Sequence, residues 1–455
     1  MNNIEIQREW FQRLINQAEP NLFGSHLPWL KKLRDNAERE IYRLPVIQRN
    51  EKEWRYSHTE KLFKQKFHPV VSTKIEYSDP EFQANTTLSQ SGIKLVFVNG
   101  QFSESLSNCE NLPDDVIVTA MHDILKTHPD LGNYWFTKTA THREHLFTVL
   151  NTALMNYGVF IYIGKKIKLD RPIEILYLNS ISEKYSSVEY KKFMGEMANL
   201  RNIIVLDDES SANIIERYSG QDELYYFNNN LTDVILGDSA NLKHTCVQDE
   251  SSAAYYMSYY YLSQHKESMY QGLFLSIGGS WSRTEINVDF KEVGAQCHLK
   301  GLNTAGNHQL TDIHIDVIHH VPSCTSRERF KSLLFGNGHA VFDGHVMVDK
   351  LAQFSDAFMT NDNLMLSRNA EVDTKPQLEI YADDVNCKHG TTVGHLDDEQ
   401  IFYMNSRGID ARVAKKMLCL GFASEIIDSI EELALRNYVS DKLNSNLNVA
   451  VSATD

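Results

Sequence analysis

Apolar residues recur at helical spacing near the start of the chain. One helical face is formed by Ile6, Trp10, Phe11, Leu14 and Ile15, and a second helix is predicted from Pro28 through Leu30, Leu33, Ala37 and Ile41. Around residues 72–85 the pattern gives way to polar residues and Pro80. We therefore predict an N-terminal helical domain over residues 1–85.

Short runs of β-branched and aromatic residues dominate from about Ile93 onward. They read KLVFV, VFIYI, IEILYL, RNIIVL, ANIIERY, DVILG, HIDVI and HAVF. In residues 313–317 the apolar side chains alternate with His314 and Asp316, as in a strand with one buried face. A helical interruption is predicted near 114–152, with Val116, Ala120, Ile124 and Leu125 on its apolar face.

Corner-like residues separate these β runs. Gly or Asn precedes a small residue repeatedly, in the segments that begin at Gly237, Gly294, Gly336 and Arg368. Many short strands with such corners fit a parallel β-helix, in which stacked coils bury one continuous core. A β-sandwich or a jelly roll would satisfy the same alternation, so the pattern alone leaves these folds open.

After Leu396 the pattern turns helical, which predicts a C-terminal helical segment over residues 397–455. Asp397, with Gln400 three residues later, is typical of a helix start, and Gly408 is expected to end that helix. Asp410 is predicted to begin a second helix that stops at Gly421, and Ser424 to cap a third. We expect residues 446–455 to be frayed. These helices would either dock a partner or pack against the β body.

Composition limits the classes of function. The chain has 455 residues and a formal net charge of −15, which argues against nucleic acid or an anionic membrane as a main partner. Its longest basic patch, Lys165, Lys166 and Lys168, is typical of a solvated loop edge. We find no signal peptide and no apolar run long enough to span a membrane, so a cytoplasmic location is expected.

The chemistry is concentrated in residues 377–408, where Cys387 and His389 lie two residues apart on a predicted strand. Residues at this spacing share one face of a strand, so a thiol and an imidazole could approach one bound species together. Both suit iron, but two ligands cannot close a metal site, which suggests half of a shared one. Alternatively, Cys387 is a buried core thiol and His389 a polar edge residue.

Other candidates carry weaker signals. His314, Asp316, His319 and His320 form the densest imidazole cluster, which could bind a metal or simply face water. His395 is either an extra ligand or a surface histidine. The six cysteines form no C-x-x-C pair, so no disulfide framework or self-contained cluster site is indicated. The sequence also lacks a phosphate-binding G-x-x-x-x-G-K-[ST] motif, so ATP hydrolysis would have to come from another chain.

The run LEIYADDVNCKHGTTVGHLDDEQIFYMNSRGI resembles the SufBD family of the Suf iron–sulfur cluster assembly machine, and within it the SufD-type chains. The resemblance extends upstream through Asp316, His319, Ser326 and the segments 341–358 and 364–376. It implies a mainly β fold with a parallel, right-handed β-helix core over residues 86–396, flanked by helical segments at both ends.

The resemblance also implies partners and roles. The chain would pair with a SufB-type paralogue near His389 and Cys387, and these two side chains would be metal ligands shared with that partner. A transient iron–sulfur cluster would be bound there, with none held stably by the isolated chain. The helices after Asp397, with Phe402, Tyr403, Arg407 and Gly408, would dock a SufC-type ATPase.

In this interpretation the chain is a non-catalytic scaffold that supplies ligands and transmits strain, and it could form a homodimer when isolated. One alternative is a SufB-like chain that carries the cluster or sulfur itself. Another is a β-helix carbohydrate-active enzyme, which would need clustered carboxylates and usually a secretion signal. A third is a passive stabilising subunit, which differs only in the effect of substituting His389.

Overall fold

The computed structural model describes residues 3–18, 22–48, 51–57, 59–70, 92–139, 145–180 and 195–452. The predicted domain boundary at residues 72–85 lies outside these ranges. Within them, no helix is long and apolar enough to cross a membrane.

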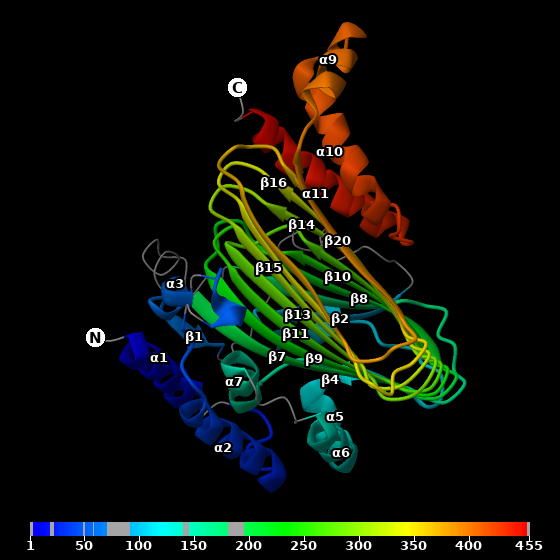
Figure 1. The fold of residues 1–455 in the computed structure, drawn as a ribbon. Helices are drawn as coiled ribbons and strands as arrows, with labels where there is room; N and C mark the ends of the chain where they lie inside the picture. The colour runs from blue at the N-terminus through cyan, green and yellow to red at the C-terminus, as the bar shows by residue number, and fades with distance from the viewer. Residues whose placement is uncertain are drawn as a thin grey trace.

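A parallel β-helix forms the body of the molecule, as the resemblance implied (Figure 1). Successive strands alternate between two ten-stranded sheets, so each long strand pairs in parallel with the strand two positions along the chain. Sheet A contains β1 (Phe67–Pro69), β4 (Val116–Ala120), β5 (Val159–Ile163), β7 (Gly195–Leu206), β9 (Tyr226–Leu236), β11 (Tyr255–Gln264), β13 (Trp281–Phe290), β15 (Leu310–His319), β17 (His339–Val348) and β19 (Glu371–Ile380). Sheet B contains β2 (Ile93–Val98), β3 (Gln101–Phe102), β6 (Ile173–Asn179), β8 (Ser211–Gly220), β10 (Asn241–Asp249), β12 (Met269–Ser276), β14 (Gln296–Ala305), β16 (Thr325–Leu334), β18 (Asp356–Met365) and β20 (Asn386–His395).

Apolar side chains from both sheets fill the interior of the β-helix. In β15 the buried residues Ile313, Ile315 and Val317 alternate with half-buried His314 and Asp316, which confirms the predicted alternation. At one corner a residue with positive φ recurs on consecutive coils, at Glu209, Ser239, Glu267, Gly294, Ser323 and Phe354. The predicted corners at Gly237 and Gly294 belong to this series of turns.

Helices cover the outer faces of both sheets. The N-terminal part contains α1 (Asn3–Ala18), α2 (Pro28–Arg43), η2 (Lys52–Trp54), α3 (Thr59–Phe63), η3 (Glu104–Leu106), α5 (Met121–Thr127), α6 (Pro129–Thr139) and α7 (Leu146–Leu154). Trp10, Phe11 and Leu14 of α1 pack in one cluster with Phe227 of β9 and Tyr259 of β11, so this end covers sheet A. The first two helices match their predicted positions.

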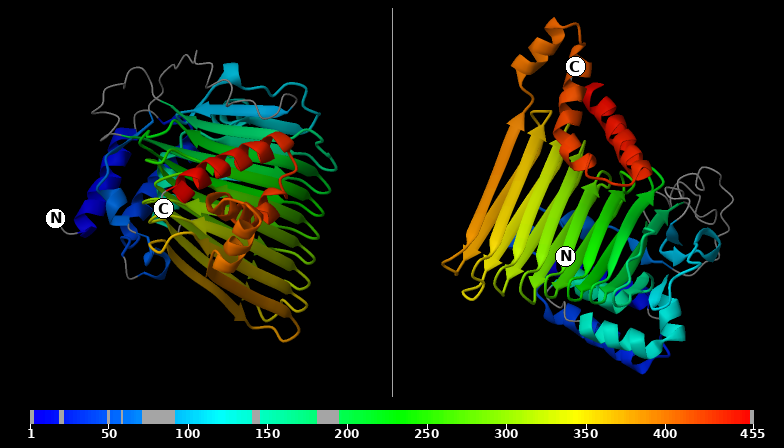
Figure 2. Two further views of the ribbon diagram at one scale, coloured as in Figure 1. Left: turned by 90° about the horizontal axis from the view of Figure 1, so that it is seen from above. Right: turned by 90° about the vertical axis from the view of Figure 1, so that its right-hand side faces the viewer.

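The C-terminal helices α9 (Asp398–Ser406), α10 (Ala411–Ile427) and α11 (Leu433–Ser452) lie on the opposite side of the β-helix (Figure 2). Cys419 and Ile426 of α10 and Leu443 of α11 pack with Val247 and Leu302 on the outer face of sheet B. These helices therefore pack against the β body, while α9 extends away from it (Figure 1).

Several helix boundaries differ from the prediction. Residues 116–120 form β4, which pairs antiparallel with β5, so only the later part of the predicted interruption is helical. Gly421 and Ser424 lie inside α10, which continues to Ile427, and the third helix begins only at Leu433. Residues 446–452 continue α11 instead of fraying. Packing of α10 against sheet B outweighs the weak stop signals of Gly421 and Ser424.

Candidate functional site

The last coil leaves two strand edges open. Among the described residues, β20 pairs only with β18 and β19 only with β17, so each presents an unpaired edge. The side chains of β20 are largely exposed, whereas those of β16, an earlier strand of sheet B, are all buried or half-buried. An unpaired edge offers backbone N–H and C=O groups to another chain.

Cys387 and His389 lie on this edge strand and share one face of it. Their register partners on β18 are Ala357 and Met359, which are buried in the interior of the β-helix. Cys387 is half-buried and packs against that interior, while His389 is exposed and its side chain makes no hydrogen bond or ion pair with another described residue. The two side chains thus mark the uncovered end of the core.

Burial raises the pKa of Cys387, so its thiol is mostly protonated near neutral pH. Interactions with Asp356 and the buried Glu328 add to this effect, and a backbone hydrogen bond from Ala357 opposes it. Lys388 is exposed and contributes nothing to the shift, as expected for a residue on the other face of the strand. Binding of a metal or a sulfur species by Cys387 therefore requires loss of its proton.

A buried carboxyl group lies further inside the β-helix, in register with Met359 and His389 on the neighbouring strands of sheet B. Glu328 on β16 is the register neighbour of Met359, which in turn neighbours His389. Glu328 is fully buried, and its oxygens have no well-formed hydrogen bond among the described residues, although the nearby Ser326 hydroxyl partly offsets the effect of burial on its pKa. Burial raises its pKa to about 8, so the carboxyl group is protonated at neutral pH.

The helix α9 presents the predicted docking residues to solvent. Asp397 caps it by accepting a hydrogen bond from the Glu399 backbone, which confirms the predicted start. None of its residues is buried, and Phe402 and Tyr403 are 75% and 59% exposed. The Arg407 guanidinium lies over the Tyr403 ring at 5.2 Å, and Gly408 follows with a φ of +83°, which ends the helix.

The predicted histidine cluster does not converge on one point. His314 Nε2 lies 2.8 Å from Asp312, whereas Asp316 pairs with His345 at 2.8 Å on the neighbouring coil. His319 points into the core, where burial lowers its pKa to about 4, so its imidazole is neutral. His320 pairs with Asp349 at the corner of the β-helix, and the Cys324 thiol is buried.

His395 lies at the far end of β20 from Cys387. It is exposed, and its ring contacts the carbonyl oxygen of Met365 at 3.1 Å. This position fits a surface histidine.

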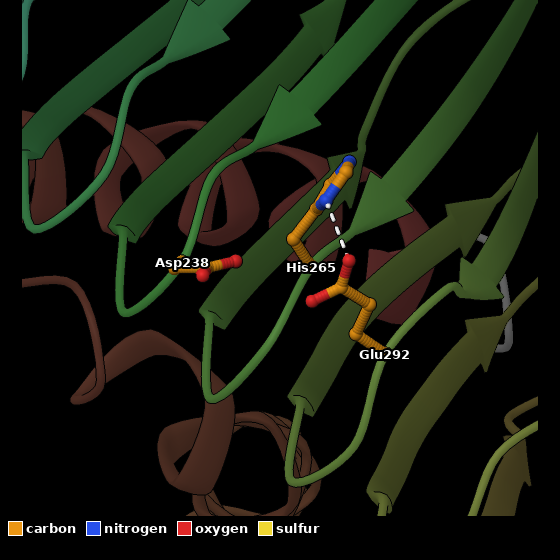
Figure 3. A group of neighbouring side chains, drawn as sticks. All are labelled: Asp238, His265 and Glu292. Carbon is orange, nitrogen blue, oxygen red and sulfur yellow. Dashed lines mark ion pairs between the residues drawn. The ribbon is translucent and has the colours of Figure 1, made fainter.

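Two groups of possible metal ligands were not predicted. Asp238, His265 and Glu292 come from corners of three successive coils, with His265 Nδ1 3.5 Å from Glu292 (Figure 3). His339, Glu371 and Asp373 form the second group, with a 2.8 Å contact between His339 and Asp373. Each group combines residues from different coils, with Glu371 and Asp373 on β19 and His339 on β17 in the second group, so knowledge of the coil length was needed to bring them together.

Comparison with known proteins gives matches along most of the chain. A family model described as "SUF system FeS cluster assembly, SufBD core domain" matches residues 189–422, and "SufBD protein N-terminal region" matches residues 5–175. The core match spans β7 to β20 and most of α10, and therefore includes Cys387, His389 and α9.

Three curated relatives cover nearly the same length. An iron–sulfur cluster assembly SufBD family protein of Synechocystis is 27% identical over 445 residues, which is 96% of this chain and 94% of the relative. The iron–sulfur cluster assembly protein SufD of Escherichia coli is 27% identical over 408 residues, covering 90% and 91%. Protein ABCI7, chloroplastic, of Arabidopsis thaliana is 28% identical over 421 residues, covering 91% and 85%.

Proposed function

Because this chain belongs to the SufBD family of the SUF system for iron–sulfur cluster assembly, we propose that it is a non-catalytic scaffold subunit that supplies ligands to a nascent cluster. The observation that carries this proposal is the position of Cys387 and His389 on one face of an unpaired terminal strand. A thiolate and an imidazole are both suitable ligands for iron. The cluster is cargo in this scheme, bound in transit and passed on.

A partner completes the site. Two protein ligands leave iron with open coordination positions, and we propose that a second chain contributes ligands to them. The free edges of β19 and β20 suit a SufB-type paralogue with the same β-helix, which would extend both sheets by strand pairing and bring its own ligands opposite His389. An isolated chain could use the same edges to form a homodimer.

The helix α9 is the proposed docking element for a SufC-type ATPase. Phe402 and Tyr403 expose large aromatic surfaces on a helix that buries none of its own residues, and such surfaces are typical of interfaces. ATP-driven movement of the ATPase would act on α9 and, through α10, on the strands of sheet B. The rearranged end of the β-helix would then admit iron and sulfide to Cys387 and His389.

The experiment is co-purification of the chain with SufB-type and SufC-type partners under anaerobic conditions, followed by measurement of iron and acid-labile sulfide. We expect His389→Ala to leave the complex intact and to reduce cluster content severalfold. His395→Ala is the matched control, since it removes an exposed imidazole from the other end of the same strand. Equal cluster content in wild type and both variants would instead assign this chain a purely structural role.

Docking of the ATPase is tested separately. Phe402→Ala should release the SufC-type partner while the SufB-type partner remains bound. Leu433→Ala is the control, because Leu433 is 65% exposed at the start of α11. Retention of the ATPase by the Phe402 variant would contradict α9 as the docking element.

A further inference from the structure

A groove of about 250 Å³ crosses the outer face of sheet A, away from the strand that carries Cys387 and His389. Its lining combines side chains from four neighbouring strands, among them Asn287, His314, Asp316, His345 and Glu379. Both of its cationic side chains are already paired: Arg283 with Glu285 at 2.6 Å, and Lys375 with Asp343 at 2.7 Å. The remaining carboxylates give this groove a negative character suited to a cation.

His345 is held in the groove by one carboxylate and faces another. Its Nδ1 contacts Asp316 Oδ1 at 2.8 Å, which fixes the orientation of the ring. Its Nε2 is buried and has no hydrogen-bond partner among the described residues, and Glu379 Oε1 lies 3.6 Å from it. The ring nitrogen and the carboxylate lie within ion-pair distance but form no hydrogen bond, and a buried polar atom without a hydrogen bond calls for an explanation.

Glu379 is also oriented by its neighbours, and the oxygen that faces His345 accepts the shorter of its two hydrogen bonds. Gln377 Nε2 donates a hydrogen bond of 2.6 Å to Glu379 Oε1, and the Tyr381 hydroxyl donates one of 3.4 Å to Oε2. Each of the two facing groups therefore has its own supporting residue: Asp316 holds His345, and Gln377 holds Glu379. Outer-shell partners of this kind are typical of metal ligands.

We propose that His345 Nε2 and the Glu379 carboxylate form a binding site for a divalent transition-metal cation of the Fe²⁺ class. Two ligands that are each about 2.1 Å from a tetrahedral metal are roughly 3.4 Å apart, close to the observed 3.6 Å. An imidazole with a carboxylate suits Fe²⁺, Mn²⁺, Co²⁺ and Zn²⁺, and the aligned Asp316–His345 pair reproduces the usual carboxylate–histidine–metal arrangement.

The site differs in kind from the one proposed for the cluster. It contains no sulfur, lies on sheet A, and uses residues of a single chain from β17 and β19. Two protein ligands leave the other coordination positions to water in the groove, so the bound cation would exchange readily. Cation binding here is independent of the scaffold proposal, since it needs neither the ATPase nor the paralogue.

The test is a titration of the isolated full chain with Co²⁺ under anaerobic conditions at pH 8, followed by visible absorption and calorimetry. The Cys387→Ser/His389→Ala double variant serves as the background, so that the β20 site cannot contribute. We expect one Co²⁺ per chain, at least tenfold weaker binding in His345→Ala and in Glu379→Gln, and an intermediate loss in Asp316→Asn. Since Glu379→Gln keeps the shape of the side chain, it tests the site even if His345→Ala does not fold.

The matched control is His265→Ala, which removes the imidazole of the exposed Asp238–His265–Glu292 group (Figure 3). Binding should be unchanged in this variant. Three outcomes would overturn the proposal: no Co²⁺ binding, binding that survives both His345→Ala and Glu379→Gln, or binding that is lost in His265→Ala. None of these outcomes bears on the effect of His389→Ala on cluster content, so the two proposals fail separately.

Discussion

Lys331 of β16 and Glu425 of α10 form an ion pair of 2.6 Å that joins the C-terminal helices to sheet B. Lys331 is nearly buried, and its Nζ also donates a hydrogen bond of 2.9 Å to the Phe422 carbonyl oxygen. Arg329 adds a second contact to Glu425 at 3.0 Å. This small network adds polar contacts between α10 and sheet B to the apolar packing of the same helix and to the direct chain connection from β20 to α9.

We expect Glu425→Gln to lower the free energy of unfolding by about 0.5–1 kcal/mol, because the carboxylate is half exposed and screened by water. Urea denaturation at pH 7 measures the change. Asp441→Asn, on the exposed face of α11, is the control and should change little. Equal stabilities for the two variants would show that the network contributes nothing.

The same network predicts a pH dependence. Hydrogen bonds from Arg329 and Lys331 lower the pKa of Glu425 to about 2. A carboxyl group with a depressed pKa stabilises the fold above its unfolded pKa of about 4.3, and this contribution is lost as the pH falls toward 2. The stability gap between wild type and Glu425→Gln should therefore be full above about pH 5 and shrink below it, as followed by urea denaturation at each pH.

A second ion pair lies entirely inside the protein. Arg201 of β7 and Asp233 of β9 are 2.6 Å apart, and both side chains are at most 3% exposed. Removal of one partner leaves an uncompensated buried charge, so Asp233→Ala should destabilise the protein by about 3–5 kcal/mol. The double variant Arg201→Met/Asp233→Leu should recover most of this loss, as measured by calorimetric unfolding. A double variant as unstable as the single one would contradict this account.

The buried carboxyl group of Glu328 should make the stability of the fold depend on pH in the opposite direction from Glu425. Its pKa is raised to about 8 by burial, so the folded protein keeps the proton while the unfolded chain releases it above about pH 4.3. Stability should then fall as the pH rises from about 4.3 to 8. Glu328→Gln removes this penalty, and its advantage over wild type should grow by up to about 1.4 kcal/mol per pH unit in that window.

Urea denaturation between pH 5 and pH 8 measures this effect. Glu292→Gln is the control, since Glu292 is exposed at a corner of the β-helix. A constant gap between Glu328→Gln and wild type across the window would show that Glu328 is already ionised in the folded protein.

Local patterns predicted the strands, the first helices and the cap at Asp397, because each depends on residues close in sequence. They failed at Gly421, which lies within α10 at a position where an added Cβ atom would have no neighbour within 4 Å. There, packing of Cys419 and Ile426 against sheet B outweighs a glycine that costs a helix about 1 kcal/mol. Packing against residues that lie far away in sequence was not visible in the pattern.

The candidate sites also differ in whether they depend on residues that are close together or far apart in sequence. Cys387 and His389 could be placed on one face because their spacing is local, and the resemblance placed that face in a functional context. The contact between Asp316 and His345 depends on the register between β15 and β17. That register is fixed by the length of a whole coil. The spacing of the corner residues along the sequence is too irregular to predict this length.

The reactivity of the cysteines tests the proposed interface directly. Only Cys109 and Cys387 are partly accessible, and burial raises the pKa of Cys109 to about 11. Iodoacetamide at pH 8 should therefore modify Cys387 first, though more slowly than a free thiol, because its own pKa is raised too. Mass spectrometry of digested peptides gives both rates.

If a SufB-type partner pairs with the edge of β20, the complex should protect Cys387 and leave the rate at Cys109 unchanged. Unaltered labelling of Cys387 in the complex would place the interface elsewhere.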